Sequence, residues 1–236
     1  MRFSGKVVLV AGGTGGLGHA VSLAFVEEGA TVIVSYRDQE EFAALKTAAG
    51  ANRPVNGDAV DVTDESAVGQ FINQTVATYG RLDAVVNAVG GYAGGPKLWD
   101  VEMKVFDRMM ALNLRSGLIL SRAAIPAMLK ARRGVFINVA SKSAFEHAAG
   151  NAAYAASKAA AVAMIDSLAE ELKGTGVRAN SILPSIIDTE ANRKAMPDAD
   201  FAKWPKAQDI AQVVLFLCSE AAKVIHGAAI PVYGAD

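Results

Sequence analysis

The chain has very little of several residue types that would point to particular function classes. Cys218 is the only cysteine among 236 residues, which excludes an internal disulfide and a cysteine-ligated zinc site, and no metal is expected. It lies in the apolar run VVLFLCSE, where we expect a buried, unreactive thiol. Aromatic residues make up only 7% of the chain, so the core must be built mainly from aliphatic side chains.

A strong charge of one sign and long apolar runs are also lacking. The 23 basic and 24 acidic residues give a formal net charge of -1, too little to attract nucleic acid or an anionic membrane. No run approaches the roughly 18 apolar residues that a membrane-spanning helix needs. The N-terminus enters an apolar strand pattern without a signal-peptide cleavage pattern. We therefore expect a cytoplasmic protein that binds neither nucleic acid nor membrane.

Short β-branched runs alternate with amphipathic stretches along the whole chain. The expected strands cover residues 6–12, 30–36, 84–90, 134–141, 177–184 and 228–234. The expected helices cover residues 19–28, 65–79, 103–130, 153–173 and 207–219. The strand runs are almost continuously apolar, as in a parallel sheet that helices cover on both faces.

Glycines mark the expected helix ends. Gly29, Gly80, Gly134, Gly174 and Gly176 fall where helices should stop, consistent with a left-handed residue just after each helix. No linker, repeat or low-complexity block divides the sequence. Residues 1–236 are therefore predicted to form a single α/β domain with a doubly wound parallel sheet, the Rossmann fold.

A glycine-rich segment, AGGTGGLG at residues 11–18, directly follows the first expected strand and opens a helical pattern. Backbone N–H groups at a helix N-terminus bind phosphate only where no side chain blocks the approach, and glycine removes that obstruction. A tight turn without a ligand is the alternative interpretation. The loop residues assigned to a dinucleotide cofactor are Gly12, Thr14, Gly15, Gly16, Leu17 and Gly18.

The end of the second expected strand bears on which cofactor binds. An acidic residue there would accept hydrogen bonds from the ribose 2'-hydroxyl of NAD, but the sequence has Tyr36. Arg37 follows at once, and its planar guanidinium suits the 2'-phosphate of NADP. NADP is therefore favoured, while Asp38 keeps NAD open, and a solvent-facing role for Arg37 is the alternative.

Four further residues recur in a characteristic order: Asn113 in ALNLRSG, Ser141 in INVAS, and Tyr154 and Lys158 in YAASK. Together with the glycine loop and NAVG at 87–90, they resemble the short-chain dehydrogenase/reductase family over nearly the full length of the chain. The resemblance implies an NAD(P)-dependent oxidoreductase in which these four residues form the catalytic tetrad. It also implies a homotetramer.

The chemistry of the tetrad can be argued from the residues themselves. Tyr154 and Lys158 are four apart on a helix, so they share a face. Carbonyl reduction needs a hydride and a proton, and Tyr154 is the natural general acid, or the general base in reverse. A free phenol has a pKa of about 10, so we expect Lys158 and the oxidised nicotinamide to lower the pKa of Tyr154. Ser141 is expected to hydrogen-bond the substrate oxygen, and the resemblance implies that Asn113 holds a water linking Lys158 to solvent.

The resemblance implies further cofactor contacts and also shows departures from the family pattern. The additional cofactor residues are Asp61 and Val62 at the adenine, Asn87 near the ribose, and Pro184, Ile187 and Thr189 toward the nicotinamide end, and Tyr154 and Lys158 of the tetrad are also expected to bind the cofactor. The departures are Ala11 in place of a threonine, NAVG in place of NNAG, and Ser185 in place of the glycine that usually follows the proline. We expect these departures to adjust how the cofactor is seated.

Two segments bear on the substrate. GGYAGG at 90–95 and DTEANRKAMPDADFAKW at 188–204 are similar to segments of dihydropteridine reductase, which reduces a quinonoid dihydropterin. That enzyme has the Tyr and Lys without the full tetrad, so a ketone or 3-oxoacyl-like carbonyl substrate ranks first here. The candidate substrate-wall residues are Tyr92, Phe145, His147, Met196 and Trp204. A catalytically silent NAD(P)-binding sensor and a scaffolding protein are the non-enzyme alternatives, and the intact tetrad argues against both.

Overall fold

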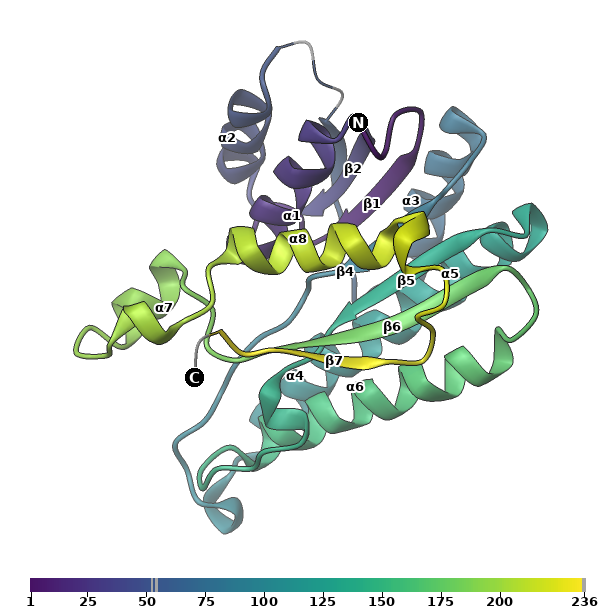
Figure 1. The fold of residues 1–236 in the computed structure, drawn as a ribbon. Coiled ribbons are helices and arrows are strands. Elements are labelled where there is room, and N and C mark those ends of the chain that lie inside the picture. Colours follow the sequence, from purple (N-terminus) through teal and green to yellow (C-terminus); the bar gives the residue numbers. More distant parts are fainter. Residues whose placement is uncertain (52, 54, 235–236) are drawn as a thin grey trace.

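A computed structural model describes residues 1–51, 53 and 55–234, which form one parallel sheet covered by helices (Figure 1). The strand order is β3-β2-β1-β4-β5-β6-β7, and every neighbouring pair is parallel. The strands are β1 (Val7–Ala11), β2 (Thr31–Tyr36), β3 (Val55–Ala59), β4 (Ala84–Asn87), β5 (Gly134–Val139), β6 (Val177–Pro184) and β7 (Ala229–Val232). The predicted doubly wound Rossmann-type fold is confirmed.

Helices cover both faces of the sheet, which explains why its central strands are apolar throughout. The helices are α1 (Gly16–Glu27), α2 (Gln39–Ala49), α3 (Glu65–Tyr79), α4 (Met103–Met110), α5 (Ser116–Ala131), α6 (Ala152–Glu171), α7 (Glu190–Ala195) and α8 (Ala207–Cys218). Buried residues of α1, α2 and α8 share one core cluster with the sheet. Those of α3, α5 and α6 share a second cluster. The fold therefore has three layers, with the sheet in the middle.

Helices α2 and α7 and strand β3 were not expected from the sequence. Strand β3 lies at the edge of the sheet, and its sequence VNGDA has only Val55 buried, so it lacks the apolar run expected of a strand. Helix α2 buries only Phe42, Leu45 and Ala49. Its start did carry a signal: the Asp38 carboxylate accepts hydrogen bonds from the N–H groups of Glu40 and Glu41, as an N-cap does.

Most of the predicted helix ends are confirmed by backbone geometry. Gly29, Gly80, Gly174 and Gly176 all have positive φ angles. The assignment of Gly134 was wrong, because this residue begins β5. Arg132 takes the left-handed conformation after α5 instead, with φ at 49°. The single helix expected over 103–130 is also interrupted, by a π-helical turn at Ala111–Arg115.

Candidate active site

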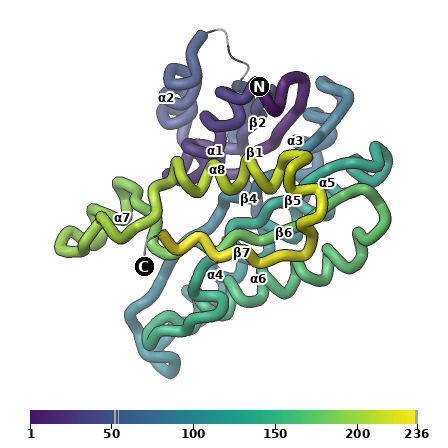
Figure 2. Tube along the Cα trace, in the orientation of Figure 1, coloured from purple at the N-terminus to yellow at the C-terminus, as the bar shows by residue number. Residues whose placement is uncertain are grey.

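The predicted site residues gather at the carboxyl edge of the sheet. Gly12 follows β1, Gly90 follows β4 and Ser141 follows β5, and these three strands are neighbours in the sheet. Because the strands are parallel, their carboxyl ends meet at one edge, where doubly wound folds bind their ligands. Helix α7, which follows β6, projects from the body of the molecule, as does the chain between β4 and α4 (Figure 2).

The N-terminus of α1 is open to an anion. Its N-cap is Gly15, which has no side chain to accept the free N–H groups. Helices α2, α3 and α7, by contrast, are capped by the side chains of Asp38, Asp64 and Thr189. No acidic residue lies in the first turn of α1, and Gly15 is exposed. Unsatisfied N–H groups at a helix N-terminus attract phosphate, so this loop fits a dinucleotide.

The glycines of the loop are required by close contacts. A Cβ atom on Gly18 would overlap the carbonyl oxygen of Gly12, whose φ is 70°. A Cβ on Gly13 would overlap the side chain of Val34 on β2, and one on Gly16 would lie 2.7 Å from Cγ2 of Thr189. The glycine loop is therefore pressed against the sheet and lies beside Thr189, which was predicted to contact the nicotinamide end.

Two other loop residues make contacts that differ in kind. The Thr14 hydroxyl donates a hydrogen bond to the Glu41 carboxylate at 2.8 Å, which ties the loop to α2. Leu17 points into the core and is 7% exposed. Thr14 can therefore reach a ligand with its backbone while its side chain braces the loop, whereas Leu17 can contribute only its backbone.

Two charged residues, Arg37 and Asp38, directly follow β2 and have different surroundings. The Asp38 carboxylate is occupied as the N-cap of α2. Arg37 is exposed, and no ion pair of Arg37 is found within the described part of the chain. The pKa of Asp61 lies below its usual range because Thr63 donates two hydrogen bonds to it, with a smaller contribution from the charge of Arg37. Arg37 is thus an exposed cation just past the end of β2.

Some predicted cofactor residues are buried in the sheet or core. Asn87 is 1% exposed; its amide donates to the Oδ1 atom of Asn138 at 2.9 Å and its own Oδ1 atom accepts from the N–H of Val89. Asn87 therefore shapes the end of β4, and the structure does not open its side chain to a ribose. Val62 and Pro184 are also buried.

Among Asn113, Ser141, Tyr154 and Lys158, the residue with the largest pKa shift is Lys158. Its Nζ atom donates a hydrogen bond to the carbonyl of Val139 on β5 at 2.9 Å, and the residue is 4% exposed. Burial lowers the pKa of Lys158 to about 8. The ammonium lies 6.0 Å from the ring centroid of Tyr154, so the two side chains do share one face of α6.

Tyr154 departs from expectation in one respect. Burial raises the pKa of its phenol, a hydrogen bond with Ser141 opposes that shift, and Tyr92 adds to it. The expected lowering by Lys158 is therefore not produced by the protein alone, because removal of the ring from water has the larger effect. The result is a phenol that keeps its proton in the neutral pH range.

Asn113 occupies the π-helical turn between α4 and α5 and is 2% exposed. Its amide donates to the hydroxyl of Ser157 and to the carbonyl of Gly91, both at 3.0 Å, and its Oδ1 atom accepts from the N–H of Gly91. A Cβ on Gly90 would lie 3.0 Å from Oδ1 of Asn113 and 3.2 Å from Nζ of Lys158. The wide turn therefore brings Asn113 toward Lys158, and π-turns are frequent at functional sites.

The predicted substrate-wall residues fall into two groups. Tyr92 packs edge-on against Tyr154, with ring centroids 5.0 Å apart, while Phe145 and His147 are exposed in the loop after β5. Met196 and Trp204 belong to the segment around α7 and are half-buried.

Sequence reasoning missed the residues that brace the segment around α7. Arg193 makes a bidentate contact with Asp188 and lies 4.9 Å from the ring centroid of Phe201, which in turn packs on Trp204. The i, i+5 spacing of Asp188 and Arg193, across the start of α7, was the available signal.

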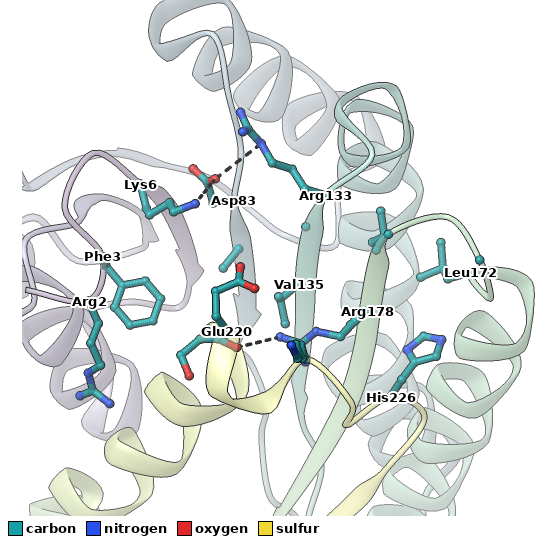
Figure 3. Close-up of a pocket in the computed structure, with 18 residues that line it drawn as sticks. Arg2, Phe3, Lys6, Asp83, Arg133, Val135, Leu172, Arg178, Glu220 and His226 are labelled. Carbon is teal, nitrogen blue, oxygen red and sulfur yellow. Dashed lines mark hydrogen bonds and ion pairs between the residues drawn. The ribbon is translucent and has the colours of Figure 1, made fainter.

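The structure also has a cavity of about 350 Å³ at the opposite, amino edge of the sheet (Figure 3). Four of its charged residues, Lys6, Asp83, Arg133 and Arg178, are already engaged with one another or with the backbone. Asp83 lies 3.6 Å from Lys6 and 3.9 Å from Arg133, and Arg178 donates to the carbonyls of Leu217, Ser219 and Ile225. These contacts hold the strand starts together, so this cavity is not the candidate active site.

Comparison with known proteins agrees with this geometry. Residues 6–200 match the short chain dehydrogenase family. The chain is 32% identical over 243 residues to "3-oxoacyl-[acyl-carrier-protein] reductase FabG" of Thermotoga maritima, covering 99% of this chain and 98% of the relative. A solved short-chain type dehydrogenase/reductase from Mycobacterium ulcerans has a TM-score of 0.94 at 26% identity, covering 99% of this chain and 90% of that one. The structure named "ElxO with NADP Bound" has a TM-score of 0.90 at 26% identity and covers 97% of each chain.

The match spans most of the chain and includes the glycine loop, the π-turn and the Tyr154–Lys158 helix, in the same order as the geometry described above. No helix in the described residues is long and apolar enough to cross a membrane. The chain belongs to the short-chain dehydrogenase/reductase family and is an oxidoreductase of that family.

Proposed function

We propose that the protein is an NADP-preferring reductase of a ketone or 3-oxoacyl-like carbonyl, with Tyr154 as its proton donor. The observation that carries this proposal is the pairing of Tyr154 with a buried Lys158, whose ammonium lies 6.0 Å from the Tyr154 ring centroid and is anchored to Val139, at the carboxyl edge beside an open phosphate loop. When bound, the nicotinamide supplies the hydride. The relative named as a 3-oxoacyl reductase supports the substrate class.

The chain's own residues would orient the carbonyl and deliver its proton. The Ser141 hydroxyl can donate a hydrogen bond to the substrate oxygen. Its position is fixed because it also accepts a hydrogen bond from the N–H of Ser143, at 3.1 Å. Tyr154 then gives its proton to the same oxygen, and the Lys158 ammonium stabilises the phenolate left behind. Asn113 holds the Gly91 backbone and Ser157 in place, which keeps the floor of the site rigid.

NADP preference is the first prediction, and it depends on Arg37. Replacement of Arg37 by leucine should raise the KM for NADPH about 10-fold or more, because a charge-assisted contact to the 2'-phosphate is lost, while the KM for NADH changes little. The measurement is initial-rate kinetics with both cofactors. Arg53→Leu, another exposed arginine outside this edge, is the matched control. Equal changes with both cofactors would contradict a 2'-phosphate contact.

A second candidate substrate is a quinonoid dihydropterin. The observation that favours it is the Tyr92 ring, which is 65% exposed and stands beside Tyr154, where a planar heterocycle could lie against it. The presence of both Ser141 and Asn113 in the site favours a carbonyl substrate instead.

We also propose that the protein is a cytoplasmic homotetramer, on the basis of the family resemblance.

The deciding experiment is oxidation of NADPH and NADH by the purified protein with ketones, 3-oxoacyl esters and quinonoid dihydropterin. Turnover of a ketone or oxoacyl ester with NADPH preferred is expected. Turnover of the pterin alone would replace the first substrate with the second. Tight cofactor binding with no turnover of any substrate would overturn both proposals.

A further inference from the structure

Tyr92 lies on the 90–95 loop (GGYAGG), between β4 and the start of α4, and takes no part in the proposed proton transfer. We propose that Tyr92 is a positioning residue: hydrogen-bonded to Asn151, it holds the ring of Tyr154 in place and screens it from water. This inference rests on the proposed function, because Tyr154 is its target. Tyr92 itself is not placed at the reacting atoms.

The contacts of Tyr92 join two elements at the site. Its ring meets that of Tyr154 edge to face, with centroids 5.0 Å apart and an interplanar angle of 75°, a preferred aromatic arrangement. Its hydroxyl donates to the Oδ1 atom of Asn151 at 2.8 Å. Asn151 is the N-cap of α6 and lies three residues before Tyr154. One side chain therefore contacts both Tyr154 and the start of the helix that carries it.

Burial does not account for the position of Tyr92. The side chain is 65% exposed, so no hydrophobic pocket holds it. The Asn151 side chain makes no capping hydrogen bond to the α6 backbone, although asparagine is a favoured N-cap residue. Its carbonyl oxygen accepts from Tyr92 instead. The chain thus uses a potential helix cap to anchor an exposed tyrosine over Tyr154.

The loop around Tyr92 is built to keep this contact. At one end Gly91 exchanges two hydrogen bonds with Asn113, and at the other the N–H of Gly95 donates to the carbonyl of Gly150 at 2.9 Å. A Cβ on Gly94 would overlap the Tyr92 hydroxyl and would lie 2.6 Å from Oδ1 of Asn151. Glycine therefore stands at the one loop position where a side chain would block the Tyr92–Asn151 hydrogen bond.

The groups that face Tyr154 are Tyr92 from the loop, Ser141 from the end of β5 and Lys158 from α6. Burial is the main reason that the pKa of Tyr154 is raised, and Tyr92 contributes to the rise directly as well. Removing the Tyr92 ring should admit water to the phenol. The pKa of Tyr154 should then fall toward its ordinary value.

The test compares Tyr92→Leu, Tyr92→Phe and Asn151→Ala, with Trp99→Leu as the matched control because Trp99 is also an exposed aromatic residue. We expect Tyr92→Leu to lower kcat about 10-fold, as the loss of an aromatic pair would, with a smaller change in KM. Tyr92→Phe and Asn151→Ala should each have a smaller effect, and their double variant should be no worse than the single ones, because both remove one hydrogen bond.

A second readout does not depend on turnover. The pKa of Tyr154 is obtained from the ultraviolet absorbance of tyrosinate, as the difference between each variant with Tyr154 present and with Tyr154→Phe. Tyr92→Leu should lower this pKa and Trp99→Leu should not. A raised KM with an unchanged kcat and Tyr154 pKa would make Tyr92 a substrate contact only and would overturn the inference. If no substrate is turned over, this titration still decides the inference while the proposed function fails.

Discussion

Tyr154→Phe should lower kcat for carbonyl reduction by about 10²–10⁴-fold, the range that general acid catalysis supplies. The substitution removes only the hydroxyl that would protonate the substrate oxygen, so the ring still packs against Tyr92. Cofactor affinity, measured by fluorescence titration, should change little. The matched control is Tyr79→Phe, which removes a phenol that accepts a hydrogen bond from Asn56, and which should leave kcat unchanged.

The pH dependence should separate the two titrating groups. Burial raises the pKa of Tyr154, so its proton is present throughout the neutral range. Lys158 loses its charge as the pH rises through about 8, and carbonyl reduction should decline above that pH because the phenolate then lacks its cation. Alcohol oxidation needs the phenolate and should rise with pH. A parent enzyme and a Tyr154→Phe variant with equal rates at every pH would exclude Tyr154 as the proton donor.

Gly18→Ala should weaken cofactor binding by about 10- to 100-fold, equivalent to about 1.4–2.8 kcal/mol. The new methyl group would overlap the carbonyl oxygen of Gly12, a backbone atom that cannot rotate away. The glycine loop must therefore shift, and its N–H groups no longer point toward the cofactor phosphate. Overpacking of this kind also costs about 1–3 kcal/mol of stability, so thermal unfolding should be measured alongside cofactor titration.

Gly69→Ala is the control for that substitution. Gly69 lies in α3, and a Cβ there would meet no heavy atom within 4 Å. The free energy of unfolding should rise by up to about 1 kcal/mol, since alanine is the better helix former. Cofactor affinity should not change. If the Gly18→Ala protein binds NADPH as tightly as the Gly69→Ala protein, the close contact of Gly12 and Gly18 is not needed for cofactor binding.

The central strands and most helices could be predicted because each buries an apolar face that repeats along the sequence. The pattern fails where burial is slight, as in β3, where Asn56, Asp58 and Ala59 are not buried. The glycine loop was also predictable, because steric exclusion acts between residues close in sequence. Gly12 and Gly18 face each other across a single turn.

The rest of the site depends on contacts between distant segments. The spacing of Tyr154 and Lys158 predicted a shared face, but only the fold reveals that Lys158 reaches the carbonyl of Val139. The pKa of Tyr154 is raised by burial, against expectation, and the ring of Tyr92 that packs on it comes from some sixty residues earlier in the chain. Asn87 is buried beside Asn138 because the register of β4 and β5 pairs these two residues, which the NAVG motif alone does not reveal.

The π-turn at Ala111–Arg115 has a consequence for how this site can be gained or lost. A π-turn accommodates one more residue than a regular α-helical turn, and regular helix continues on both sides of it in α4 and α5. Loss of a single residue there would let 103–131 run as one uninterrupted helix, with the buried Asn113 displaced from Gly91 and Ser157. Exchange of one side chain for another cannot produce that change. The position of Asn113 therefore depends on the number of residues in this turn. Deletion of one codon there should disable the site and leave a regular helix.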